Sequence, residues 1–88
     1  MAIRLTREAL EYYILTCLSI QDMYGAEILK SANTNVDISS PSFYQILNSL
    51  QQEGKIAKRA TVQNGVACHL CSITPLGQFY LDAFLKSQ

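Results

Sequence analysis

Hydroxyl and amide side chains recur between residues 42 and 52 at spacings that place them on one side of a helix. At about 100° per residue, five uncharged polar residues fall within an arc of about 120°: Ser42, Gln45, Asn48, Ser49 and Gln52. Amide groups pair with adenine, and serine hydroxyls bond to bases or to phosphate. The pattern therefore indicates base readout in DNA; the alternative is a polar helix face that is only solvated.

Basic side chains follow this segment. Lys55, Lys58 and Arg59 lie at the start of a region with strand character. Lysine and arginine side chains bind the phosphate backbone of DNA. Ser40 precedes a proline and can cap the helix, whose first N–H groups are free to bind a phosphate. Tyr44 borders the apolar stripe. Its hydroxyl either reaches a phosphate, or its ring completes the edge of the core.

The C-x-x-C sequence from Cys68 to Cys71 invites a metal or redox interpretation. A zinc site needs four ligands, and only His69 lies nearby. The segment reads as a strand, on which residues three apart point to opposite faces, so we expect small buried cysteines instead. The sequence also lacks paired carboxylates and a glycine-rich phosphate loop. We therefore expect no enzymatic activity, no metal and no cofactor.

Length and composition bound the class of protein. The chain has 88 residues with a formal net charge of zero, 49% hydrophobic and 16% charged residues. These values predict one domain over residues 1–88 and exclude a disordered chain. No apolar run is long enough to span a membrane and no secretory signal is apparent, so we expect a cytoplasmic protein with free thiols. Zero net charge argues against a strongly basic nucleic-acid binder. However, acidic residues concentrate outside residues 55–59.

Periodicity and capping residues predict the order helix, helix, helix, hairpin, helix. The helices are expected at 7–20, 23–32, 41–53 and 75–86, capped by Thr6, Asp22, Ser40 and Thr74. Asn64-Gly65 is a strong hairpin signal between strands 56–62 and 66–73. The fold class is therefore mainly α with a small β-hairpin, a winged helix-turn-helix. In it, Asn64 lies at the tip of the wing and joins the candidate DNA-binding residues.

The first and fourth helices carry more aromatic surface than a small core can plainly bury. Five of these residues are candidates for a dimer interface, since aromatics are enriched at interface centres: Tyr12, Tyr13, Phe79, Tyr80 and Phe84. The alternative is that they complete the core of a monomer. A two-fold dimer would place two recognition helices about one DNA turn apart.

Five segments in order resemble the PadR-like transcription regulators, a branch of the winged helix-turn-helix superfamily. Residues 23–28 (MYGAEI) are similar to the family's "hGYEI", and 42–47 (SFYQIL) to "TLYPAL". Residues 50–54 (LQQEG) look like "LEKEG", 73–77 (ITPLG) like "ITEAG", and 14–18 match an apolar run in the first helix. The resemblance covers about residues 10–84. It implies a dimeric DNA-binding protein, here a short single-domain member.

The expected function is a homodimeric, sequence-reading DNA-binding protein acting as a transcription repressor. The helix over 41–53 would enter the major groove and the wing over 56–73 would lie on the backbone. Two alternatives remain: a DNA-coating adaptor of the partition type, and a winged-helix interaction module that no longer binds DNA. The uncharged second wing strand favours the latter. The expected partners are double-stranded DNA and a second copy of the chain, and an effector ligand or partner protein is left unassigned.

Overall fold

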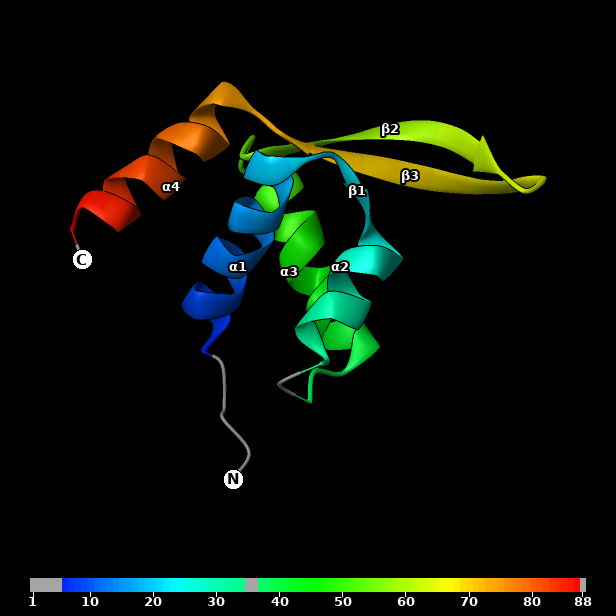
Figure 1. The fold of residues 1–88 in the computed structure, drawn as a ribbon, viewed down its shortest axis with the longest axis horizontal. Coiled ribbons are helices and arrows are strands. Elements are labelled where there is room, and N and C mark those ends of the chain that lie inside the picture. Colours follow the sequence, from blue (N-terminus) through cyan, green and yellow to red (C-terminus); the bar gives the residue numbers. More distant parts are fainter. Residues whose placement is uncertain (1–5, 35–36, 88) are drawn as a thin grey trace.

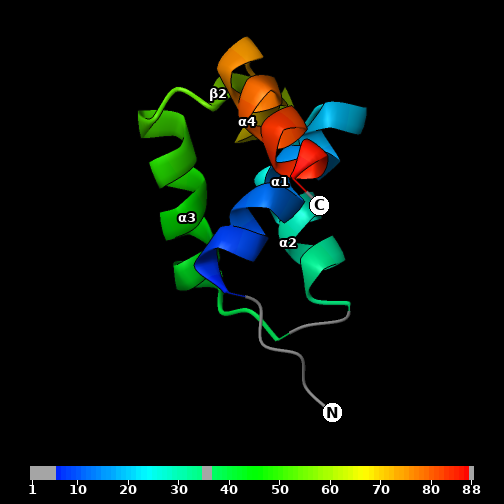
Figure 2. The ribbon, with the colours of Figure 1, turned by 90° about the vertical axis from the view of Figure 1, so that its left-hand side faces the viewer.

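The computed structural model describes residues 6–34 and 37–87 and shows a helical body from which a long hairpin projects (Figure 1). The elements follow the chain as α1 (Arg7–Ile20), β1 (Met23–Tyr24), α2 (Gly25–Ala32), α3 (Ser40–Gln52), β2 (Ile56–Gln63), β3 (Val66–Ile73) and α4 (Pro75–Lys86). Turning the molecule by 90° shows α1 between α3 and α2, with α4 lying across the top of α1 (Figure 2). The predicted fold class, a winged helix mainly of α structure, is confirmed.

Three helices begin at side-chain caps. The Thr6 hydroxyl accepts from the Ala9 N–H at 3.1 Å, and the Thr74 hydroxyl accepts from the Gly77 N–H at 3.1 Å, as expected. The cap of α3 is Ser39, however, and the prediction of Ser40 was wrong by one residue. Ser39 has extended backbone angles and accepts from the next turn, whereas Ser40 is already helical. Ser40 is therefore an exposed residue of the first turn.

The second helix starts later than predicted. Met23 and Tyr24 form a short strand that pairs antiparallel with Cys71 and Leu70, so the sheet has three strands in the order β1-β3-β2. The helix begins at Gly25, and the Glu27 carboxylate accepts from the Tyr24 N–H at 3.0 Å. Asp22 does not cap it. A two-residue strand has no periodicity to detect, and only its pairing with β3 defines it.

The hairpin forms as predicted. Strands β2 and β3 pair in register from Ile56–Ile73 to Gln63–Val66. Asn64 and Gly65 have φ of 53° and 78°, the left-handed pair that a two-residue turn of this twist requires. Gly54, at φ 79°, ends α3 in the same region of backbone space. The distal half of the hairpin extends beyond the helices (Figure 1).

The core lies where α1, α2 and α3 meet the base of the sheet. Helical spacing places four apolar residues on one side of α3, and all four are buried: Phe43, Ile46, Leu47 and Leu50. Helical spacing predicts an apolar stripe on α4 that consists of Leu76, Phe79, Tyr80, Ala83 and Phe84. This prediction was wrong, because only Gly77 and Leu81 of α4 are fully buried. Leu76 and Phe79, which the stripe contained, are 44% and 67% exposed. No helix among the described residues is both long and apolar enough to cross a membrane.

Candidate nucleic-acid interface

The outer face of α3 presents uncharged polar groups to solvent. Ser42, Gln45, Asn48 and Gln52 are exposed, and α3 carries no charged residue. The Ser42 hydroxyl accepts from the Ser39 hydroxyl at 2.8 Å, which ties it to the helix start. Amides and hydroxyls on an exposed helix face can donate hydrogen bonds to base edges and accept hydrogen bonds from them.

The hairpin brings one basic side chain onto this face. Lys58 donates from Nζ to Oδ1 of Asn48, so the wing and α3 touch through two residues of the predicted DNA-binding set. Lys58 lies two residues after Ile56, so the two side chains are on the same face of β2. Because Ile56 is buried on the core side of the sheet, Lys58 also points toward the helices. The contact was not predicted from the sequence, although the two-residue spacing between Ile56 and Lys58 was a signal for it.

Arg59 points the other way. It lies one residue after Lys58 and opposite Leu70, so its side chain is on the outer face of the hairpin, where it is exposed. Asn64 is exposed at the hairpin tip. The wing therefore has one basic residue on each face near its base. Residues 60–67, its distal half, carry no charge.

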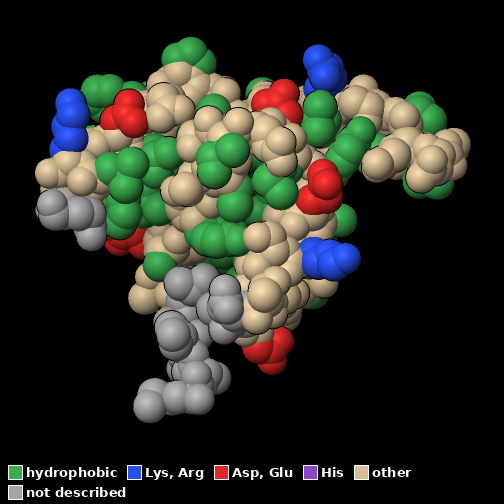
Figure 3. Space-filling view, viewed as in Figure 1, with side chains coloured by type: hydrophobic (Ala, Val, Ile, Leu, Met, Phe, Trp, Pro, Cys, Tyr) green, Lys and Arg blue, Asp and Glu red, His purple; other side chains and the backbone are tan. Residues whose placement is uncertain are grey.

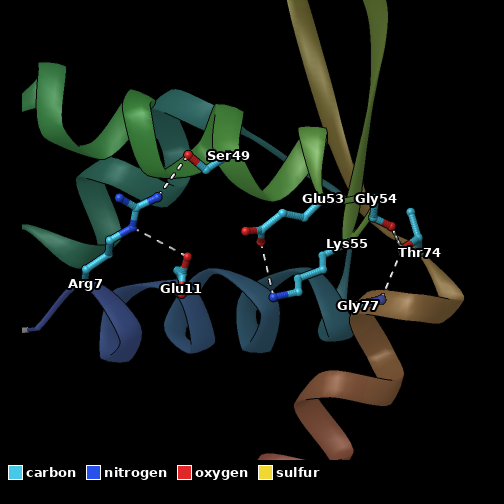
Figure 4. A network of polar contacts seen from close by, with 8 residues as sticks. All are labelled: Arg7, Glu11, Ser49, Glu53, Gly54, Lys55, Thr74 and Gly77. Carbon is cyan, nitrogen blue, oxygen red and sulfur yellow. Dashed lines mark hydrogen bonds and ion pairs between the residues drawn. The ribbon is translucent and has the colours of Figure 1, made fainter.

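Two residues of the predicted DNA-binding set have partners elsewhere in the chain (Figure 4). The Ser49 hydroxyl is half-buried beside α1 and accepts from Arg7 at 3.0 Å. Lys55 forms an ion pair with Glu53 at 3.2 Å, and its ammonium lies 4.2 Å from the centroid of the Tyr80 ring. Both side chains are engaged at helix junctions, and their assignment to the DNA-binding set stays a prediction.

Tyr44 lies at the edge of a pocket of about 260 Å³ between the start of α2, α3 and the base of the wing. Its lining includes Tyr24, Lys58 and His69 in addition to Tyr44. Gly25 permits this close approach, since a Cβ there would lie 3.2 Å from the Tyr44 ring. The Tyr44 side chain is 38% exposed, so it is both packed on α2 and open to solvent.

The three cysteines are free thiols. Cys71 is buried in the core, whereas Cys68 is half-buried and lies 3.5 Å from the Thr61 hydroxyl. Burial raises the pKa of the Cys71 thiol, and the nearby Lys58 charge offsets part of that rise. Within residues 6–34 and 37–87, no three His, Cys, Asp or Glu residues gather as a metal site would require.

The aromatic residues predicted for a dimer interface divide into two groups. Tyr12 and Phe84 stack on each other, with ring centroids 3.9 Å apart, and so join α1 to α4 within one chain. The Tyr13 hydroxyl lies 2.6 Å from that of Ser31 and joins α1 to α2. Phe79 and Tyr80 remain 67% and 41% exposed on α4.

Other apolar side chains are exposed beyond that set. Leu76 and Leu85 on α4 are 44% and 55% exposed, and Ile20 at the end of α1 is 78% exposed. Hydrophobic side chains gather over the region of α1 and α4 on the face shown in Figure 3. Ile20 and Leu85 were not predicted as interface residues from the sequence, because the exposure of a side chain depends on how the helices pack.

Solved structures share this fold. A PadR-like transcriptional regulator from Bacillus cereus is 27% identical over 92% of this chain and 82% of its own, with a TM-score of 0.82. The protein smu.1704 from Streptococcus mutans has a TM-score of 0.92 at 24% identity, covering 99% of this chain and 82% of its own. PadR from Bacillus subtilis, solved in complex with operator DNA, is 25% identical over 86% of this chain, with a TM-score of 0.77.

This chain spans 46% of the length of the Bacillus subtilis protein. No family model and no curated protein matches the sequence. The structural likeness nevertheless bears out the resemblance to PadR-like regulators that the five sequence segments indicated.

Proposed function

We propose that this PadR-like winged-helix chain is a homodimeric, sequence-reading DNA-binding protein that acts as a transcription repressor. The observation that carries the proposal is the exposed amide and hydroxyl face of α3, with Lys58 of the wing resting on it. The structural likeness to PadR solved with operator DNA supports a DNA partner. We assign the chain no enzymatic reaction.

The side chains take two kinds of role in this proposal. Gln45 and Asn48 read base edges from the outer face of α3, which enters the major groove. Lys58 lies beside Asn48 on this face. Arg59 and Tyr44 hold the phosphate backbone, and Ser40 and Ser42 offer hydroxyls near the start of the helix. Asn64 approaches the DNA from the wing tip. With few basic residues in the set, we expect modest affinity from one protomer.

The second copy is proposed to pack on α4. Phe79, Tyr80, Leu76 and Leu85 are exposed there, and such a set of apolar side chains on one helix is typical of an interface. In this assignment the single domain serves both purposes, with α3 and the wing on the DNA and α4 with α1 in the dimer. Two recognition helices then bind two half-sites of one operator.

One observation favours a second candidate, an interaction module that binds protein in place of DNA. The distal wing carries no charge, and Val62 and Val66 near its tip are 72% and 65% exposed. A basic wing tip binds phosphate groups, whereas an uncharged tip with exposed valines can pack against the surface of another protein. The DNA-binding experiment below separates the two candidates.

Electrophoretic mobility shifts of mixed genomic fragments, at low and at moderate salt, test the proposal. We expect retention at low salt that weakens as salt rises, because bound phosphates release counterions. The Arg59→Ala variant should weaken retention and reduce the salt dependence. Absence of retention at every salt concentration contradicts the DNA-binding function and leaves the interaction module.

A further inference from the structure

We infer that Lys58 and Asn48 act together as a reader of guanine, with the wing lysine setting the base preference of the recognition helix. The inference rests on the proposed DNA-binding function and deepens it by naming a base. It follows from the contact between these two side chains and from where each is held.

The contact determines the orientation of the amide. A lysine ammonium has three donors and no acceptor, so the Asn48 atom that it touches must be the oxygen. The Asn48 Nδ2 group, with its two hydrogens, therefore points away from Lys58. Asn48 is exposed on the outer face of α3, so this donor group is free to meet a base.

Lys58 is held over α3 by its place in the sheet. It shares the inward face of β2 with the buried Ile56, and it lines the same pocket as Tyr44 and Leu47 of α3. Lys58 lies opposite the buried Cys71 in the neighbouring strand. The Lys58 charge lowers the pKa of the Cys71 thiol and so offsets part of the rise that burial causes. These observations agree with the hydrogen bond and place the ammonium beside the recognition face.

Side by side, the ammonium and the amide N–H groups present donors only. Guanine offers two acceptors, N7 and O6, in the major groove, whereas adenine offers the acceptor N7 beside the donor N6. Against adenine, the N6 amino group would face the Lys58 ammonium, and two donors cannot form a hydrogen bond with each other. The pair therefore fits guanine, which differs from the adenine preference of a free asparagine.

Gln45 provides an internal contrast. It lies almost one turn before Asn48 on the same face, and no hydrogen bond of its side chain occurs within residues 6–34 and 37–87. Its amide keeps both a donor and an acceptor, the combination that pairs with adenine. The wing thus makes two amides of one helix chemically different.

The experiment is selection of bound DNA by the full chain, followed by sequencing, for the wild type and for Lys58→Met. Methionine keeps the length of the side chain and removes the donor. Arg59→Met is the matched control, because it removes the same charge from the opposite face of the hairpin. The base contacted by residue 48 is identified as the position whose preference is lost in Asn48→Ala.

At that position we expect guanine for the wild type and for Arg59→Met, and a shift toward adenine for Lys58→Met, with a change of about tenfold in the guanine-to-adenine ratio. Replacing that guanine by 7-deazaguanine, which lacks the N7 acceptor, should weaken wild-type binding. It should have a smaller effect on Asn48→Ala.

Three results overturn the inference while the proposed function stands. They are selection of adenine by the wild type, a guanine preference in Lys58→Met equal to that of the wild type, and bound DNA without a preferred base at this position. Failure to retain any DNA at low salt overturns the proposed function, and the guanine reader with it. The readouts differ, so the two failures are distinguishable.

Discussion

A Cβ atom on Gly77 would lie 2.0 Å from the carbonyl oxygen of Lys55, so the first turn of α4 rests directly on the backbone that joins α3 to β2. The same carbonyl accepts from the Thr74 N–H at 3.1 Å. Backbone atoms cannot rotate away as a side chain can. This contact therefore determines where α4 leaves the wing and which side chains it exposes.

Gly77→Ala should lower the free energy of unfolding by at least about 2 kcal/mol, because overpacking against backbone forces the helix to move. Urea denaturation followed by circular dichroism measures the change. Gln78→Ala, at the next position, is the control and should have an effect of about 0.5 kcal/mol or less. Equal stability of Gly77→Ala and the wild type would contradict the close packing.

Thr74→Ala should destabilise the fold by about 1–2 kcal/mol, since the hydroxyl caps α4 and also donates to the Gly54 carbonyl at 2.6 Å. Thr74→Ser keeps the hydroxyl and should retain most of the stability. Thermal unfolding of both variants measures the difference. Similar losses in the two variants would show that the methyl group, and not the cap, matters.

Phe79→Glu should convert the proposed dimer into a monomer, because it places a charge on the exposed apolar face of α4. Light scattering after size-exclusion chromatography gives the mass. Gln63→Glu adds the same charge on the wing and should leave the mass unchanged. A dimeric Phe79→Glu variant, or a monomeric wild type, would exclude α4 as the interface.

Gln45→Ala should reduce discrimination between bases by about 1–3 kcal/mol, because the amide contacts a base edge. Arg59→Ala should instead weaken binding to all sequences alike, since a phosphate contact carries no sequence information. Fluorescence anisotropy with a selected site and with a scrambled site separates the two effects. Uniform weakening by Gln45→Ala would remove it from the base-reading set.

Stability should decline at alkaline pH through Cys71. Burial raises the pKa of its thiol above the ordinary value of about 8.5, so the folded state holds the proton more tightly than the unfolded state. The contribution is complete below that ordinary value and is lost as pH rises through the raised pKa. Urea denaturation between pH 7 and pH 10 should show this decline, and Cys71→Ala should reduce it.

Local patterns predicted the elements that depend on local chemistry. The Asn64-Gly65 turn, the end of α3 at Gly54 and the caps at Thr6 and Thr74 follow from backbone preferences that a few residues determine. The buried side of α3 follows from helical spacing, because one continuous stripe meets the core. The prediction of Asp22 as a cap was wrong because strand pairing with Leu70 and Cys71 outweighs a local capping preference.

The sequence by itself determined the winged-helix order and the uncharged face of α3, since periodicity and turn residues act over a few positions. Only the tertiary structure decided which of those residues are free. Arg7 donates a hydrogen bond to Ser49. Lys55 forms an ion pair with Glu53 and lies over the ring of Tyr80. Lys58 reaches from the wing and donates a hydrogen bond to Asn48. These partners are up to 42 residues apart in the chain. The packing of helices and sheet brings such distant groups together, and the spacing of residues within one element does not encode it.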